Sequence, residues 1–256
     1  MIIDSLTHIT SDGKWFNTNH VCSLSRLTKM IETYSIEKSI LCGMPVTDDS
    51  ETILKAVGAY PDKFLAVAGF HPVGKSAAEI EEEIKSIAKK GFIGIKIHPR
   101  LSKLKLDSEE VLCAIKKAGE YGLVSFICTI NRPPAQPLNR PLYDAIHYLC
   151  AESISSKIVL LHGGYYELLS VSEIVRPFEH VFLDLSTTLI RFIDTSLRED
   201  IKFLIKTFDK RIVFGSDFPE YSYGDVLDSL KILGFERKWL ENQGVLGDNF
   251  MKFIEQ

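Results

Sequence analysis

The sequence predicts an α/β protein of the (β/α)8 class, a TIM barrel that forms one domain over residues 1–256. Three observations predict this fold class. Short apolar runs alternate with amphipathic helical segments from one end of the chain to the other. No linker or change in composition divides them. The length of 256 residues is typical of such a barrel built as a single domain.

Eight short runs predict the strands. Each is rich in β-branched, leucine or aromatic residues, and most end at glycine, proline or a polar residue. Because every strand of such a barrel is parallel, all of their carboxyl ends face one mouth. In chain order the predicted strands are 2–6, 38–45, 64–72, 92–99, 123–128, 157–164, 180–186 and 212–215.

Between the strands, apolar residues recur at helical spacing. The 77–90 segment places acidic residues before basic ones, which suits the helix dipole. Gly122 follows the 108–121 segment, at the position where glycine ends a helix. The proline-rich segment 131–141 predicts a long, stiff loop on the side where the strands end. The predicted helices are 24–34, 48–60, 77–90, 108–121, 142–152, 166–176, 195–208, 225–233 and 241–254.

Composition predicts an ordinary globular protein of the cytoplasm. Hydrophobic residues make up 45% and charged residues 25%, enough for a full core. The net charge of −4 and the lack of a basic stripe argue against nucleic acid or membrane as the main partner. No secretion signal or membrane-spanning segment is predicted. Five cysteines without a C-x-x-C spacing indicate reduced thiols.

Histidines gather at the predicted strand ends. Of the seven in the chain, His8, His71, His98 and His162 fall there, and Asp217 follows the last strand. In a barrel these positions surround one cavity, where catalytic groups lie. Histidines and a carboxylate around one cavity can support either of two kinds of chemistry. Neutral imidazoles and a carboxylate can hold a divalent metal that activates water. Without metal, they can act as an acid/base cluster.

Five sequence segments, taken in this order, resemble the amidohydrolase superfamily, specifically its amidohydrolase-related branch. They are Ile-Asp-Ser-Leu-Thr-His at 3–8, Gly-Ile-Lys-Ile-His-Pro at 94–99, Leu-His-Gly-Gly at 161–164, Phe-Gly-Ser-Asp-Phe-Pro at 214–219 and Val-Leu-Gly-Asp-Asn-Phe at 245–250. The resemblance implies a distorted barrel that hydrolyses amide, ester or lactone bonds, or decarboxylates. It also implies one zinc-like ion at the mouth, and an assembly that is often a homodimer.

Two positions depart from the family pattern. The first strand of the family carries His-x-His, whereas here Leu6 precedes His8. The fifth strand of the family ends on a histidine, whereas here Cys128 stands in its place. Cysteine binds zinc well, so a metal site of His8, Cys128, His162 and Asp217 is one expectation. The other is a site without metal, because the pyrone dicarboxylate lactonases of the same family work without one.

The expected enzyme is a hydrolase of a small, anionic substrate. Asp217 deprotonates the attacking water, His162 orients it or polarises the substrate, and His8 binds metal or donates a hydrogen bond. We expect His71, His98 and Arg132 to contact the substrate, although structural roles for each remain open. Two alternatives also stay open. One is a metal-independent lactonase or decarboxylase, and the other is a catalytically degenerate barrel that only binds a ligand or partner.

Overall fold

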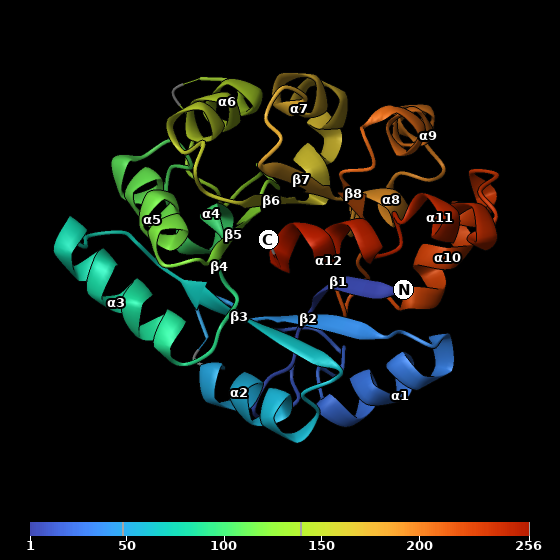
Figure 1. The fold of residues 1–256 in the computed structure, drawn as a ribbon, viewed down its shortest axis with the longest axis horizontal. Helices are drawn as coiled ribbons and strands as arrows, with labels where there is room; N and C mark the ends of the chain where they lie inside the picture. Colours follow the sequence, from blue (N-terminus) through green and yellow to red (C-terminus); the bar gives the residue numbers. More distant parts are fainter. Residues whose placement is uncertain (48, 139, 256) are drawn as a thin grey trace. The chain divides into compact units, whose positions relative to one another are not determined.

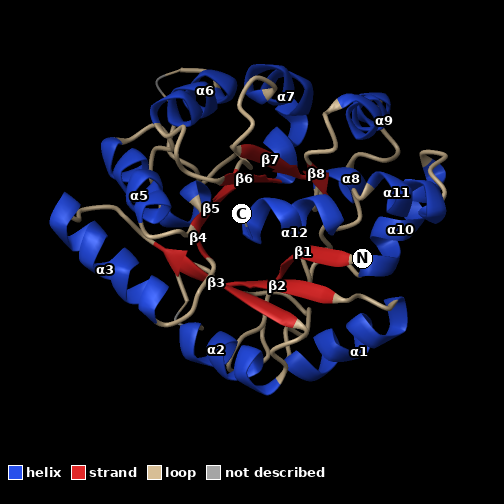
Figure 2. Cartoon of the chain, viewed as in Figure 1, coloured by secondary structure: helices blue, strands red, loops and turns tan. Residues whose placement is uncertain are grey.

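The computed structural model describes residues 1–47, 49–138 and 140–255. All eight strands belong to one parallel sheet in the order β1-β2-β3-β4-β5-β6-β7-β8, which is the predicted (β/α)8 barrel class. The strands are β1 Ile3–Thr7, β2 Lys38–Cys42, β3 Phe64–Phe70, β4 Gly94–Ile97, β5 Val124–Cys128, β6 Ile158–Leu161, β7 Val181–Asp184 and β8 Ile212–Val213. Figures 1 and 2 show helices alternating with these strands along the chain.

Helices follow the strands in the predicted order. They are α1 Leu24–Tyr34, α2 Ser50–Ala59, α3 Ala77–Lys89, α4 Pro99–Ser102, α5 Glu109–Glu120, α6 Leu142–Glu152, α7 Leu168–Val175, α8 Thr188–Arg191, α9 Leu197–Thr207, α10 Tyr223–Ile232, α11 Arg237–Gln243 and α12 Asp248–Glu255, with the 3₁₀ helix η1 at His162–Glu167. The predicted first residue of the second helix, Asp48, lies outside the described residues. So does Asn139 of the 131–141 loop. The short helices α4 and α8 were not predicted. Among the described residues, no helix has the length and apolar character needed to cross a membrane.

The predicted helix 241–254 is wrong as a single element. The chain leaves α11 at Gly244, whose backbone is left-handed with φ 70°, and a new helix begins at Asp248. Only glycine adopts this conformation without strain, so the residue ends the helix. The last strand is also shorter than predicted, because β8 ends at Val213 rather than Gly215.

The chain forms two compact units. The first consists of Met1–Gly43, Asp49–Ala66 and the chain from Asp184 onward. The second consists of Val67–Leu183 with a short segment that begins at Met44. Within the second unit, α3, α5, α6 and α7 lie on the outer side of strands β4 to β7 (Figure 1).

Each unit has strands buried on both faces. Every residue of β1 is buried in the first unit, and every residue of β4, β5 and β6 is buried in the second. Full burial of one such valine, leucine, isoleucine or phenylalanine contributes about 1.5–3 kcal/mol to stability. This burial stabilises the strands whose carboxyl ends carry the predicted site residues.

Candidate active site

His8 follows β1 in the first unit and is held on three sides. Its backbone N–H donates to the Phe218 carbonyl at 2.9 Å. Its Nδ1 lies 2.6 Å from the Cys42 carbonyl oxygen, and its ring stacks on Trp15 with centroids 4.7 Å apart. A carbonyl oxygen only accepts, so Nδ1 carries the ring proton and donates it to Cys42. In the neutral ring, Nε2 therefore presents its lone pair.

Trp15 is itself fixed by a carboxylate of the same unit. The indole Nε1 donates to Glu220 Oε1 at 2.6 Å, and only 5% of Trp15 is exposed. The indole thus covers one face of the His8 ring. It excludes water from that face and keeps the ring in one orientation.

Asp217 lies beside His8, with its two carboxylate oxygens in different surroundings. Oδ1 is 3.4 Å from His8 Nε2, and Oδ2 accepts a hydrogen bond from Thr187 Oγ1 at 2.7 Å. The Asp217 side chain is 15% exposed, compared with 2% for His8, so the carboxylate is the member of the pair that solvent reaches. The Nε2 lone pair and the carboxylate are both acceptors. A proton or a cation between them stabilises this arrangement.

The loop that carries Asp217 is tied to β1 through the residue before it. Asp4 accepts two hydrogen bonds from Ser216, one from the backbone N–H at 2.8 Å and one from Oγ at 2.6 Å. Burial raises the pKa of the Asp4 carboxyl to about 7, against the lowering effect of these bonds, and the nearby Asp184 carboxylate raises it further. Asp4 thus anchors the backbone on which Asp217 is placed.

The geometry of His8 and Asp217 fits two ligands of a divalent metal. Ligands about 2.0–2.1 Å from a tetrahedral zinc ion lie about 3.3–3.4 Å apart, close to the 3.4 Å between Nε2 and Oδ1. A backbone carbonyl on the other ring nitrogen is a common partner of metal-binding histidines. Among the described residues, however, no group of three or more His, Cys, Asp or Glu side chains is arranged to hold a metal ion.

The other two predicted ligands, Cys128 and His162, lie in the second unit together with His98. Cys128 ends β5 and is 1% exposed. Burial raises the pKa of its thiol, but the charges of His98 and His162, and their hydrogen bonds to the sulfur, outweigh burial and hold the pKa well below its usual range. The three side chains therefore form a cluster that favours the thiolate.

His162 is held in an uncommon backbone conformation. It follows β6 with φ 66°, and the next three residues also have positive φ, two of them glycines. The turn is braced by Thr129, whose hydroxyl donates to the Leu161 carbonyl at 2.6 Å and accepts from the Gly164 N–H at 2.8 Å. Glycines allow this sharp turn, which redirects the chain at the end of the strand.

The predicted substrate-contacting residues are placed as follows. His98 lies with Cys128 rather than standing alone. His71 follows β3, and its Nδ1 is buried without a hydrogen-bond partner among the described residues. The Arg132 guanidinium lies 5.7 Å from the centroid of the Tyr165 ring, a cation–π contact.

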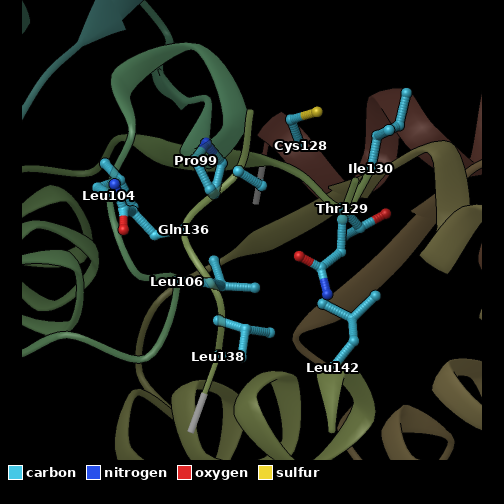
Figure 3. Close-up of a pocket in the computed structure, with 11 residues that line it drawn as sticks. Pro99, Leu104, Leu106, Cys128, Thr129, Ile130, Gln136, Leu138 and Leu142 are labelled. Carbon is cyan, nitrogen blue, oxygen red and sulfur yellow. The ribbon is translucent and has the colours of Figure 1, made fainter. Parts of the chain in front are cut away.

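A small pocket opens beside Cys128 in the second unit (Figure 3). Its volume is about 10 Å³, room for roughly one water molecule. Figure 3 shows Leu106, Leu138 and Leu142 on the side opposite Cys128. The full lining is Pro99, Leu104, Leu106, Cys128, Thr129, Ile130, Asn131, Ala135, Gln136, Leu138 and Leu142. The 131–141 loop thus supplies part of an apolar wall next to the thiol.

Sequence reasoning missed Thr187 and Trp15, which contact Asp217 and His8 directly. Thr187 could have been found, because it stands just beyond a buried strand, as the predicted site residues do. Trp15 lies in an irregular segment without periodicity, and its sequence carries no signal of the contact.

Comparison with known proteins agrees with the fold. The family model described as "Amidohydrolase" matches residues 37–241. The chain belongs to this amidohydrolase family. A search of curated protein sequences found no match.

Solved structures share the fold at low sequence identity. A probable 2-pyrone-4,6-dicarboxylic acid hydrolase from Acinetobacter baumannii, with citric acid bound, superposes with a TM-score of 0.71 at 13% identity, covering 100% of this chain and 99% of that one. A dihydroxybenzoic acid decarboxylase from Polaromonas sp. JS666, with manganese and the inhibitor 2-nitroresorcinol, gives 0.72 at 13%, covering 99% and 96%. A TIM-barrel protein from Bordetella bronchiseptica gives 0.81 at 15%, covering 99% and 98%.

Proposed function

We propose that this chain is a hydrolase that cleaves an amide, ester or lactone bond in a small, anionic molecule, with Asp217 activating the attacking water. The observation that carries the proposal is the orientation of the His8–Asp217 pair. The Cys42 carbonyl directs the His8 Nε2 lone pair toward Asp217 Oδ1, and the carboxylate is the more exposed partner. Such a pair can take a proton from water and hold it until the leaving group departs.

In this mechanism the proton of the attacking water passes to Asp217 Oδ1. His8 stabilises the outcome, because its Nε2 accepts a hydrogen bond from the newly protonated carboxyl. When the bond to the leaving group breaks, the same proton is available for the leaving atom. Trp15 keeps the His8 ring in place throughout, since it stacks on one face of the ring.

His162 polarises the substrate or orients the water in the same proposal, and His71, His98 and Arg132 contact the substrate. Arginine suits a carboxylate, which its guanidinium can bind through two parallel hydrogen bonds. Both the pyrone dicarboxylate hydrolase and the dihydroxybenzoate decarboxylase are named for carboxylate substrates, which supports an anionic substrate here.

His8 and Asp217 would hold a divalent ion if one binds, with Cys128 and His162 as the further ligands that we propose. The ion would supply a water of lowered pKa, and hence hydroxide near neutral pH. The residues of the chain keep their orienting roles in either case, because the Cys42 and Thr187 contacts fix the two side chains independently of a metal.

The test uses protein purified without chelator or histidine tag, after its metal content has been measured by elemental analysis. We would assay 2-pyrone-4,6-dicarboxylate, 4-nitrophenyl acetate and 2,6-dihydroxybenzoate, following ring opening, nitrophenolate release and carbon dioxide release. Asp217→Asn should lower hydrolytic kcat by about 10²–10⁴-fold, the usual contribution of a general base. Its fold should be unchanged by circular dichroism.

The matched control is Asp194→Asn, which removes an exposed carboxylate outside the site. It should leave turnover unchanged. Carbon dioxide release without hydrolysis would reassign the reaction to decarboxylation. Ligand binding without any turnover would support the binding-only alternative, and an unaffected kcat in Asp217→Asn would rule out the mechanism.

A further inference from the structure

Thr187 occupies a strained turn just after β7. Its backbone has φ 59° and ψ −52°, and the N–H of Thr188 donates to the Ser186 carbonyl at 2.5 Å, so these three residues form a γ-turn of positive φ. This turn is the rare and strained form of the γ-turn. Threonine is branched at Cβ, which makes positive φ especially unfavourable. The turn is therefore maintained against local preference.

The strained turn presents the Thr187 hydroxyl to Asp217. Oγ1 donates to Asp217 Oδ2 at 2.7 Å, and the Thr187 side chain is buried. The other carboxylate oxygen, Oδ1, faces His8 Nε2 at 3.4 Å. Each carboxylate oxygen thus faces a different residue: Oδ2 faces Thr187 and Oδ1 faces His8.

Rotation about the Cβ–Cγ bond of aspartate is broad and nearly two-fold, so the backbone of Asp217 does not by itself fix the carboxylate plane. A hydrogen bond to one oxygen fixes that plane and so aims the other oxygen. Backbone strain beside a functional group often indicates that the geometry is needed for the function.

We propose that Thr187 is a positioning residue, whose hydroxyl holds Oδ2 so that Oδ1 of Asp217 stays directed at His8. The inference rests on the proposed function, in which Asp217 Oδ1 receives the proton of the attacking water. The competing interpretation is that the hydrogen bond only ties the loop after β7 to the loop after β8.

Two variants separate these interpretations. Thr187→Val keeps the shape and the branching but removes the hydroxyl, and Thr187→Ser keeps the hydroxyl. In crystal structures, we expect the Asp217 carboxylate to rotate away from His8 in Thr187→Val and to stay in place in Thr187→Ser. In turnover of the best substrate, Thr187→Val should lose about 10- to 100-fold in kcat, the effect of one hydrogen bond to a charged group, with KM little changed. Thr187→Ser should restore kcat to within about threefold of the native value.

An unmoved Asp217 carboxylate in the Thr187→Val crystal structure overturns the inference, whatever the activity. So does equal turnover by Thr187→Val and the native protein. If the native protein turns over none of the tested compounds, the proposed function fails, and the crystal structures still decide the positioning role. If Thr187→Val does not fold, Thr187→Gly removes the hydroxyl while relieving the strained backbone, and it should give the same carboxylate rotation.

Discussion

Cys128 differs from two other buried cysteines, Cys22 and Cys150, in the charges that surround it. Burial raises the pKa of Cys22 and of Cys150 to about 12 each, so these two are neutral thiols near pH 7. Cys128 is equally buried, but His98 and His162 outweigh burial and lower its pKa well below the usual range. The neighbouring side chains thus shift the pKa of one buried cysteine in the opposite direction from that of the other two.

This contrast predicts that Cys128 is a thiolate at neutral pH, whereas Cys150 is a neutral thiol. After chelator treatment, the ultraviolet absorbance of thiolate should fall in Cys128→Ser relative to the native protein, and stay unchanged in Cys150→Ser. The sign for stability follows from the lowered pKa. The Cys128 thiolate adds to the free energy of unfolding at pH values above the ordinary pKa of a thiol. This added stability is lost as the pH falls through the pKa of Cys128 in the folded chain. Equal absorbance in the native protein and Cys128→Ser would show that the two histidines do not stabilise the thiolate.

At the scale of the element, the buried strands could be predicted from sequence and the turns that follow them could not. Runs such as Phe64–Phe70 are apolar throughout, and burial leaves them few alternatives. The residues after them are placed by strain and by contacts distant in sequence. His162, Thr187 and Asp217 all have positive φ. None is a glycine, and positive φ is an outlier for the β-branched Thr187, although aspartate and histidine adopt it more often than most residue types.

The same limit applies to the candidate site. His8 and Asp217 could be placed at strand ends from the pattern alone, and the structure brings them together. The partner that fixes the His8 tautomer is the backbone carbonyl of Cys42. Any residue type supplies a carbonyl, so no sequence pattern can reveal this contact.

The chain breaks between α11 and α12 because of the backbone conformation of Gly244. The helical spacing of apolar residues in 241–254 gave no sign of this break. Gly244 has φ 70°, and a Cβ there would lie 2.6 Å from Asn249 Oδ1. Asn249 donates to the Gln243 carbonyl at 2.8 Å, so a displaced Asn249 loses a bond that holds the turn. Gly234 has a similar φ of 83° but open space around it, which makes it a control for backbone strain alone.

We expect Gly234→Ala to lower the free energy of unfolding by about 1–2 kcal/mol through its left-handed backbone. Gly244→Ala should cost about 1 kcal/mol more, because Asn249 must also move. Urea unfolding measures both, with an unchanged m-value as the check that the unfolded states are alike. Equal costs for the two variants would show that Asn249 adapts without loss.

At the scale of the whole molecule, buried carboxylates couple stability to pH. Asp4 and Asp184 are both fully buried, and Asp184 accepts hydrogen bonds from Ser5 and from the Ser186 hydroxyl. The Asp184 carboxylate makes ionisation of Asp4 less favourable, because two negative charges repel strongly away from water. Burying two carboxyl groups so close together lowers the stability of the fold. Asp4 also binds the backbone of Ser216, in the loop that carries Asp217.

The raised pKa of Asp4 predicts stability that falls as pH rises. The folded pKa is about 7 against an ordinary 3.8, so between these values the folded chain binds the proton more tightly than the unfolded chain. The contribution of Asp4 to the free energy of unfolding is fully present below about pH 4 and is lost as pH rises through about 7, an effect on the order of 4 kcal/mol.

Asp4→Asn mimics the protonated acid at every pH. The difference in unfolding free energy between this variant and the native protein should therefore grow from about pH 4 to 7 and then level off. A difference that stays constant with pH would mean that Asp4 ionises in the fold as it does in the unfolded chain. In that case the Ser216 hydrogen bonds, rather than burial, set its charge.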